Sequence, residues 1–250
     1  MIRRTDKDEA RNPGARKRSP SRAQTRTRAR GRPPKTAEGH AEMRRTFLEA
    51  TRRVFAREGY HALSVELVLR EAGLSRPTFY KYFESVDAAI DVVLREVNDD
   101  LIESLLSAIS SASAPYDKLE AALLAWRSWG ERLGPMLRPL FAELHDPHSP
   151  ASRHRKRTQR LLAKHFLSAS EAIGRPAPAP LMLETLIQGM EFLGYRYHFE
   201  TKRDAESWRI TREAMLRLAF GMLATEPELA HAVPLLRAAN VRLSHEERTP

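Results

Sequence analysis

The sequence contains no cysteine, and this single absence excludes several chemistries. Without thiols the chain forms no disulfide, binds no metal through thiolate and uses no cysteine nucleophile. It also has no run of eighteen apolar residues, which a membrane-spanning helix requires, and no apolar stretch follows its basic first residues as in a secretory signal. We therefore expect a cytoplasmic protein.

Enzyme motifs are missing as well. The sequence shows no nucleophile elbow, no phosphate-binding glycine loop and no paired carboxylates in a recognisable setting. Four histidines, His145, His148, His154 and His165, have no carboxylates at helical spacing that would complete a metal-ligand set. We expect a protein that is not an enzyme and that needs no metal or other cofactor.

Positive charge is abundant, and it is concentrated at one end of the chain. Of the net charge of +10, residues 1–40 carry 13 Lys or Arg against four acids, whereas the rest of the chain has 29 basic and 28 acidic residues. An arm that is rich in charge and poor in large apolar residues cannot offset its ordering entropy, so we expect 1–40 to be disordered on its own. Its charge predicts contact with DNA.

One segment of this arm, Arg30-Gly-Arg32-Pro-Pro-Lys35, resembles the core of an AT-hook. Such a narrow, extended segment can place Arg30 and Arg32 in an A·T-rich minor groove, with Lys35 beside them. The alternative is a basic tether that only neutralises phosphates. The sequence leaves both interpretations open.

From residue 41 onward, apolar residues recur with the period of a helix, and no alternating run predicts a sheet. The first helix is expected at about 41–58, with Phe47, Leu48, Val54 and Phe55 on its buried face. A longer one should run from Ser85–Asp87 to about Ser110. Further helices are predicted near 116–133, 135–145, 150–173, 181–200 and 204–224. The expected fold is all-α, with a polar tail at 226–250.

Two short helices joined by a glycine turn predict a helix-turn-helix at about 64–83. Ser64 should cap the first, Gly73 makes the turn, and Ser75 should cap the second, Ser75–Tyr82. Hydrogen-bond donors and one rigid apolar residue occupy the face of the second helix that lies opposite the core. These candidate DNA contacts are Ser75, Arg76, Pro77, Thr78, Tyr80 and Lys81, with Ser64 at the start of the motif. An ordinary helical hairpin with a solvated polar face is the alternative.

The stretch from Phe47 to Tyr60, then Ser64-Val, Ala72-Gly-Leu-Ser75 and above all Thr78-Phe-Tyr-Lys-Tyr-Phe83 resembles the N-terminal DNA-binding domain of the TetR family. The resemblance covers about residues 41–95. It implies a homodimer whose paired recognition helices read a palindromic operator. It also implies a C-terminal domain in which a small molecule alters the spacing of those helices, and usually repression that the ligand relieves.

Carried over from the family, Arg76 and Pro77 correspond to base-reading positions. Thr78 and Tyr80 correspond to contacts with backbone or base, and Lys81 to a phosphate contact. Phe79 and Phe83 correspond to core positions and should not touch DNA. The chain departs from the family at Val86, where members often have a lysine, so one customary phosphate contact is in doubt.

The resemblance divides the chain from residue 41 to residue 225 into two regions. Residues 41–92 correspond to the helix-turn-helix domain and 93–225 to a domain for effector binding and dimerisation. Apolar and aromatic side chains flank a Gly-Pro break in the second region, and they are either a ligand pocket or simply core. The pocket candidates are Trp126, Trp129, Leu133, Met136, Phe141, His145, Phe166, Met190 and Tyr195.

Wide apolar stripes on the last two helices suggest a four-helix interface between two copies, as the resemblance implies. The interface candidates are Leu186, Leu193, Tyr197, Trp208, Met215, Leu218 and Met222. Arg153, Arg157, Arg160 and Lys164 form a basic stripe at helical spacing, which is more often a solvated face than an anion site.

A regulator is not the only DNA-binding function that the sequence allows. An architectural protein of the nucleoid type could use the basic arm alone and bind with little sequence preference. The two hypotheses differ in the recognition helix, because an architectural role predicts that Arg76 and Lys81 matter equally on all DNA. A regulator predicts that Arg76 matters mainly on its own operator.

Overall fold

The computed structural model describes residues 36–172 and 174–225, which form helices joined by short connections, with no strand in these ranges. The predicted all-α fold is confirmed. The arm up to residue 35 and the tail from 226 lie outside the described residues. The minor-groove contacts expected of Arg30, Arg32 and Lys35 therefore stay predictions.

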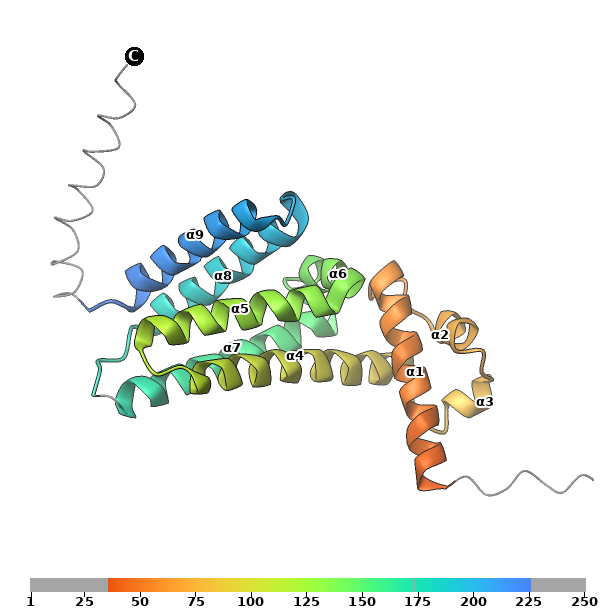
Figure 1. Cartoon of the computed structure of the whole chain (residues 1–250). Helices are drawn as coiled ribbons and strands as arrows, with labels where there is room; N and C mark the ends of the chain where they lie inside the picture. The colour runs from red at the N-terminus through yellow and green to blue at the C-terminus, as the bar shows by residue number, and fades with distance from the viewer. Residues whose placement is uncertain (1–35, 173, 226–250) are drawn as a thin grey trace, which may run out of the picture. The chain divides into compact units, whose positions relative to one another are not determined.

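Figure 1 labels the helices in chain order. In the described ranges one 3-10 turn, Gly134–Met136, lies directly before α6. Their bounds are α1 Ala37–Glu58, α2 Val65–Ala72, α3 Arg76–Phe79, α4 Val86–Ser111, α5 Pro115–Leu133, α6 Leu137–Ala142, α7 Pro150–Ala172, α8 Pro180–Glu200 and α9 Ala205–Leu223.

Three helix ends differ from the sequence prediction by three or four residues. Helix α1 begins at Ala37, four residues before the expected start, and α6 ends at Ala142, three residues short. Helix α3 ends at Phe79 instead of Tyr82, because the N–H groups of residues 81 and 82 bond to carbonyls three residues back, which is a tighter turn than an α-helix. Apolar periodicity does not distinguish these two turn types.

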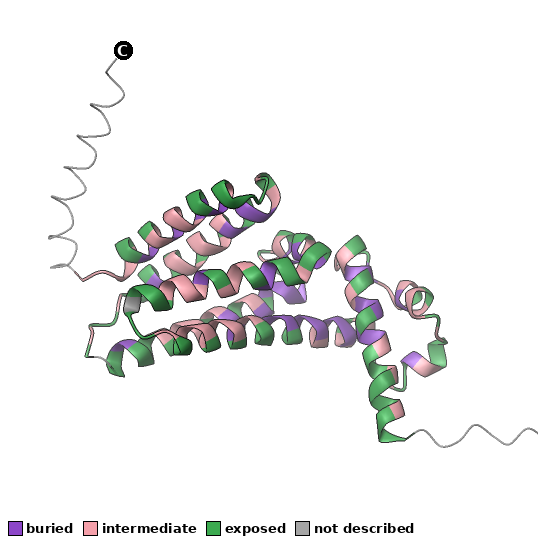
Figure 2. Ribbon diagram, in the orientation of Figure 1, coloured by how far each residue is buried: buried purple, intermediate pink, exposed green. Residues whose placement is uncertain are grey.

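The main hydrophobic core joins the N-terminal helices to the rest of the described chain. Phe47 and Val54 of α1 are buried in it together with Ile90 and Val93 of α4. Trp129 of α5 is buried in the same core. Figure 2 shows the buried residues along α1 and the first half of α4. The indole N–H of Trp129 donates to the carbonyl of Val97 at 3.1 Å. Burial on this scale stabilises by about 25 cal/mol for each Å² of apolar surface removed from water.

A second, smaller core holds α5, α8 and α9 together. Tyr197 and Met215 are completely buried in it, with Leu123 and Trp208 nearly so. The Arg127 guanidinium lies over the Trp208 ring at 4.9 Å from its centroid. This arrangement gives α8 and α9 one inward face and leaves their other faces uncovered.

No helix in the described ranges is long and apolar enough to cross a membrane. Within the same ranges, no group of three or more His, Asp or Glu side chains is placed to hold a metal ion.

Candidate nucleic-acid interface

Gly73 makes the tight turn between α2 and α3. Its backbone is left-handed, with φ 65° and ψ 29°, and its N–H donates to the Leu69 carbonyl. A residue with a Cβ takes this conformation only at a cost, which explains the glycine. The N–H of Leu74 bonds to the same carbonyl at 3.3 Å. The turn therefore sets α3 at a defined angle to α2, as a helix-turn-helix requires.

Phe79 fixes the orientation of α3. Its side chain is completely buried, and its ring meets that of Phe47 edge to face at 5.3 Å between centroids. The Phe83 ring lies at 5.6 Å on another side. Because the inner face of so short a helix is occupied by one large ring, the opposite face must point to solvent. Phe79 and Phe83 are core residues, as the resemblance implied.

The predicted DNA contacts lie on α3 and in the turn that directly follows it. Arg76, Pro77 and Lys81 are exposed, and Tyr80 is 50% exposed although it is a large aromatic residue. Thr78 is half-buried. Two cations beside an uncovered aromatic ring suit phosphates and base edges. These five residues thus form one continuous segment that is largely exposed, interrupted only by the buried Phe79.

The two serines of the motif have different roles. Ser64 caps α2, since its hydroxyl accepts the N–H of Leu67 at 3.4 Å. Ser75 is the N-cap residue of α3, as predicted, but its side chain makes no capping hydrogen bond. Its hydroxyl instead bonds to the Thr78 hydroxyl at 2.8 Å, which links two candidate DNA contacts to each other.

Arg76 is already engaged in the DNA-free protein. Its guanidinium forms an ion pair with Glu66 on α2, and both side chains remain more than half exposed. An exposed pair of this kind is weak and screened by salt. The carboxylate therefore holds the arginine near the interface without sequestering it.

Sequence reasoning missed the first turns of α1, which reach the recognition helix. The Tyr82 hydroxyl lies 3.2 Å from Nδ1 of His40, and the Arg44 guanidinium stands over the Phe83 ring at 5.5 Å. Arg44 is exposed and precedes Phe47 by three residues, so it shares that face of the helix. That spacing was the available signal that Arg44 lies beside the helix-turn-helix.

The expected lysine at the start of α4 has no counterpart here. Val86 packs against the main core, and Ser85 caps the helix by accepting the N–H of Ala88 at 3.1 Å. Val86 therefore offers no ammonium group for the phosphate contact that was in doubt. Arg44 of α1 is an exposed cation close to Phe83, at the end of the motif.

The connection between α6 and α7 holds the connection between α1 and α2. Glu143 is buried, accepts the backbone N–H of Tyr60 at 2.7 Å and accepts the Ser149 hydroxyl at the same distance. A side chain at Gly59 would crowd this carboxylate. The DNA-binding helices are thus tied to α6 and α7 by a buried charge-assisted hydrogen bond.

An exposed ion pair accompanies this contact. The hydrogen bond to Asp146 raises the pKa of His61, and the same bond lowers the pKa of Asp146. Both side chains are charged only at pH values between the pKa of Asp146 and the pKa of His61. The ion pair is lost when His61 gives up its proton as pH rises, and when Asp146 gains one as pH falls.

The predicted ligand-pocket residues are divided between the two cores and the surface. Trp129 and Met136 are buried in the main core, against which Leu133 and Phe141 pack, while Trp126 and Met190 pack against the second core. Phe166 is half-buried, and His145 and Tyr195 are exposed. For Trp129 and Met136 the alternative interpretation, that they are core, is the correct one.

The interface candidates also separate. Tyr197, Trp208 and Met215 are buried within the protomer, so their assignment to a dimer interface is wrong. Leu186, Leu193, Leu218 and Met222 are half-buried. The apolar stripes of these two helices are wide because each combines a face that is buried within the protomer with a face that is exposed. The outward face carries exposed apolar side chains, namely Leu181, Met182, Phe192, Ile210 and Phe220.

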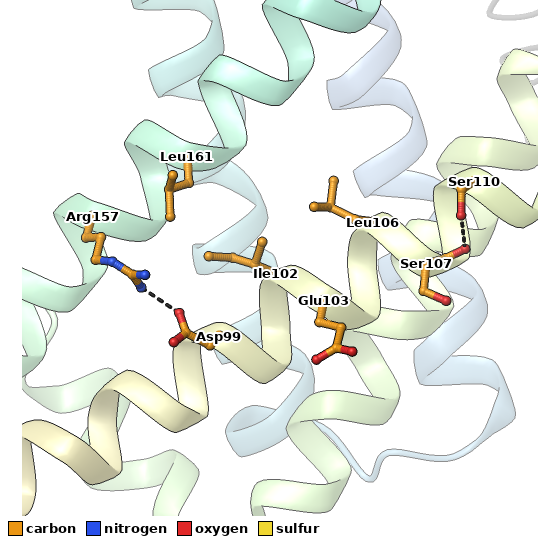
Figure 3. Close-up of a pocket in the computed structure, with 8 residues that line it drawn as sticks. All are labelled: Asp99, Ile102, Glu103, Leu106, Ser107, Ser110, Arg157 and Leu161. Carbon is orange, nitrogen blue, oxygen red and sulfur yellow. Dashed lines mark hydrogen bonds and ion pairs between the residues drawn. The ribbon is translucent and has the colours of Figure 1, made fainter.

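Two grooves lie beside α7. One, of about 610 Å³, runs between α4 and α7, where Ile102 and Leu161 line it and Arg157 pairs with Asp99 at 2.6 Å (Figure 3). The other, of about 620 Å³, lies between α7 and α8. Neither groove is lined by a predicted pocket residue.

Comparison with known proteins agrees with this geometry. Residues 47–88 match the family model for bacterial regulatory proteins of the tetR family. Over 85 residues the chain is 31% identical to the HTH-type transcriptional activator FasR of Mycolicibacterium smegmatis, a match covering 34% of this chain and 39% of that protein. The chain therefore spans well under half the length of this curated relative.

Solved structures share the fold over most of the chain. A putative tetR family transcription regulator from Shewanella sp. PV-4 is 19% identical, with a TM-score of 0.60, and covers 74% of this chain and 99% of its own. The Thermus thermophilus FadR, a TetR family repressor in complex with lauroyl-CoA, is 21% identical, with a TM-score of 0.52, over 73% of this chain and 96% of its own. Residues 47–88 therefore match the DNA-binding segment of the tetR family, and the described helices share the fold of solved structures from that family.

Proposed function

We propose that the protein is a homodimeric repressor that reads a palindromic operator and releases it when a small molecule binds. One observation carries the DNA-binding part of this proposal: neighbouring aromatic residues of the recognition helix have opposite burial. Phe79 is completely buried, whereas Tyr80, in a segment that also holds Arg76 and Lys81, is 50% exposed. A helix anchored on one side and uncovered on the other is suited to enter a major groove.

In this proposal, Arg76 reads base edges while Lys81 and Arg44 contact phosphates. A guanidinium can donate two parallel hydrogen bonds to guanine O6 and N7, which gives it sequence information. An ammonium on a flexible stem contributes mainly charge. Thr78 and Tyr80 complete the surface with hydroxyl groups.

The uncovered face of α8 and α9 supports the dimer. Phe192 is 60% exposed and Ile210 is 55% exposed, on adjacent helices. Exposed apolar residues that cluster over two helices mark an association surface. Two such helix pairs, related by a two-fold axis, would form a four-helix interface and place two recognition helices on one duplex.

Helix α4 supports coupling between an effector and DNA. It begins directly after the helix-turn-helix and runs beside α7, to which Asn98 is joined by a buried 2.9 Å hydrogen bond from Thr158. His154 of α7 bonds to Asp91 of α4 at the same distance. An effector that shifts α7 would therefore move α4, and it lowers operator affinity if it favours the conformation that does not bind DNA.

The names of the relatives support regulation but divide on its sign. FasR is named an activator and the Thermus FadR a repressor. We assign repression to this chain, and a reporter gene under a promoter that carries the selected operator tests the sign. Higher reporter output after deletion of the regulator supports repression, and lower output contradicts it.

The experiment for the DNA-binding proposal is selection of bound sequences from a randomised duplex pool, followed by Arg76→Ala. The variant should lose about ten- to a hundredfold in affinity for the selected sequence and much less for random DNA, because a base contact is worth about 1–3 kcal/mol. An architectural protein, the second candidate, would yield no enriched palindrome and equal losses on both DNAs.

Deletion of residues 1–36 tests the role of the basic arm. If the arm neutralises phosphates, both operator and random DNA should lose affinity by similar factors, and the salt dependence should flatten by about 0.9 in logarithmic slope for each phosphate that the arm no longer neutralises. If Arg30–Lys35 docks in the minor groove, operators with A·T flanks should lose more than those with G·C flanks.

A further inference from the structure

We propose that the groove between α7 and α8 binds an amphipathic anion, a linear apolar chain that ends in a carboxylate or a phosphate. The regulatory consequence of this binding rests on the proposed function, but the binding itself does not. At about 620 Å³, the groove lies within the range of small-molecule sites, about 300–1,000 Å³.

The floor of the groove is apolar. Ala163 and Leu167 contribute from α7, and Leu183 and Ile187 contribute from α8. Leu183 is buried, whereas Leu167 is 39% exposed, so the floor opens from covered to uncovered surface. An apolar chain lying along it would remove this surface from water, at about 25 cal/mol for each Å².

The rim of the groove is cationic. Arg153, Lys156 and Arg160 line it from α7, and Glu184 of α8 is the one acid among the lining residues. Arg153 is 3.7 Å from Asp91, at the limit of an ion pair. Within the described ranges, no carboxylate lies within ion-pair distance of Lys156 or Arg160. The rim therefore holds positive charge that the chain does not neutralise there.

The neighbouring arginines of the same helix show the contrast. Arg155 is paired with Glu191 of α8 at 2.6 Å through a largely buried side chain, and Arg157 is paired with Asp99 of α4 at the same distance. These two arginines join α7 to its neighbours. Lys156 and Arg160, which alternate with them, face the groove instead. Charge complementarity therefore favours an anionic head group over a neutral or cationic one.

The position of the groove on α7 suggests how its occupancy would reach DNA. One face of α7 lines the groove, and another bonds to α4 through His154 and Thr158. A ligand that separates α7 from α8, or draws them together, changes the packing of α7 on α4. Because α4 leads directly into the helix-turn-helix, the two recognition helices of a dimer would change their spacing.

Titration calorimetry on the full chain tests the proposal with four probes of equal length kept below their micellar concentrations. These are dodecanoate, dodecyl phosphate, dodecanol and dodecylamine, and inorganic phosphate is a fifth. Both anions should bind, dodecanol should bind more weakly, and dodecylamine should be weakest. A preference for dodecanoate or for dodecyl phosphate decides the source of the head group. Binding of inorganic phosphate as tight as that of dodecyl phosphate would overturn the role of the floor.

Two variants separate the rim from the floor. Lys156→Gln combined with Arg160→Gln should weaken both anions about tenfold and leave dodecanol unchanged. Ala163→Trp, which fills the half-buried floor, should weaken all the alkyl probes. The matched control is Lys118→Gln, an exposed lysine of α5 away from the groove, and it should change nothing. Circular dichroism confirms that each variant is folded.

The proposal is overturned if the anions bind the rim variant as tightly as the parent, or if dodecylamine matches dodecanoate. It is also overturned if no probe binds and the rim variant instead changes the dimer by light scattering, because the groove is then covered by a second copy. Anion binding that leaves operator affinity unchanged supports the site and contradicts the ligand-responsive regulation. Operator binding without anion binding overturns the site and leaves the DNA-binding proposal standing.

Discussion

The indole of Trp126 on α5 occupies the space in which a side chain at position 194 of α8 would stand. Four residues along each helix the relationship is reversed, since the His198 ring of α8 covers Gly130 of α5. Each helix therefore contributes one ring and one glycine to the crossing. The two glycines set how closely α5 and α8 approach.

Gly194→Ala should destabilise the protein by about 1–3 kcal/mol, because the added Cβ overlaps Trp126 and forces the helices apart. Gly221→Ala is the matched control, since no atom lies within 4 Å of a Cβ at that helical position. The control should be neutral or stabilising by up to about 1 kcal/mol. Urea unfolding at one protein concentration measures both, and equal effects would contradict the interlocked crossing.

His198 should make the protein sensitive to acid. Burial lowers its pKa from 6.5 to about 4, and its Nε2 has no hydrogen-bond partner. The unfolded chain takes up a proton below pH 6.5, whereas the folded chain does not until about pH 4. The stability that this difference provides is present above pH 6.5 and is lost as pH falls.

Between pH 7.5 and pH 5, this residue should cost the parent about 2 kcal/mol of unfolding free energy. His198→Leu should remove that part of the pH dependence, whatever its effect at pH 7.5. Denaturant unfolding at the two pH values is the measurement. An unchanged pH dependence in the variant would show that His198 is not the group responsible.

The sequence was sufficient where one local rule decides the structure. Gly73 and Ser64 predicted the helix-turn-helix, helical periodicity placed Phe47 in its core, and the family resemblance did the same for Phe79. The sequence did not show in the same way which apolar side chains pack inside the protomer. Tyr197 and Met215 lie on an apolar stripe that periodicity cannot assign to the protomer or to a partner. Their complete burial in the second core decides that question.

The sites in the C-terminal region could not be predicted for a similar reason. Aromatic residues such as Trp126 and Trp129 suggested a pocket, but aromatic rings also fill the spaces between helices. Where they lie depends on glycines on other helices, such as Gly194, which are distant in sequence. In the sequence, the α7–α8 groove was visible only as a basic stripe that also included Arg157. Which of these cations are paired, as Arg157 is with Asp99, depends on how α7 packs on α4.

Phe79→Ala and Tyr80→Ala should separate the anchoring of the recognition helix in the core from its contact with DNA. Phe79→Ala should cost about 3–5 kcal/mol of stability, since it empties the centre of the aromatic core, and DNA binding should fail with it. Tyr80→Ala should change stability by no more than about 0.5 kcal/mol but weaken operator binding. Thermal unfolding and DNA titration measure the two quantities. A large loss of stability in Tyr80→Ala would contradict its assignment to the surface.

Glu66→Gln should strengthen DNA binding several-fold at low salt. The substitution releases Arg76 from its ion pair and removes a negative charge beside the phosphates. Because the charge is exposed, the gain should shrink as salt rises and the Debye length falls below about 10 Å. Fluorescence anisotropy with a labelled duplex at several salt concentrations is the test. Weaker binding would mean that Glu66 holds Arg76 in the conformation that DNA requires.

Glu143→Ala should expose the backbone of the α1–α2 connection. Without the carboxylate, the Tyr60 N–H loses its acceptor, at a cost of about 1–3 kcal/mol. Hydrogen exchange at this amide should accelerate, while exchange in α9 should not change. Unchanged protection at Tyr60 would show that the hydrogen bond does not hold the two connections together.

The continuity of α4 determines how this protein can be divided. The boundary predicted between residues 92 and 93 falls inside one unbroken helix, Val86–Ser111, and the core around Phe47 continues to Trp129 and Leu140. A fragment cut at 92 would lose Val93, Leu94 and Val97 from its own interior and expose what remains. The DNA-binding half is therefore not a detachable module. Proteases should find no cleavable hinge there, and chimaeras that exchange sensing halves should be joined beyond this shared core.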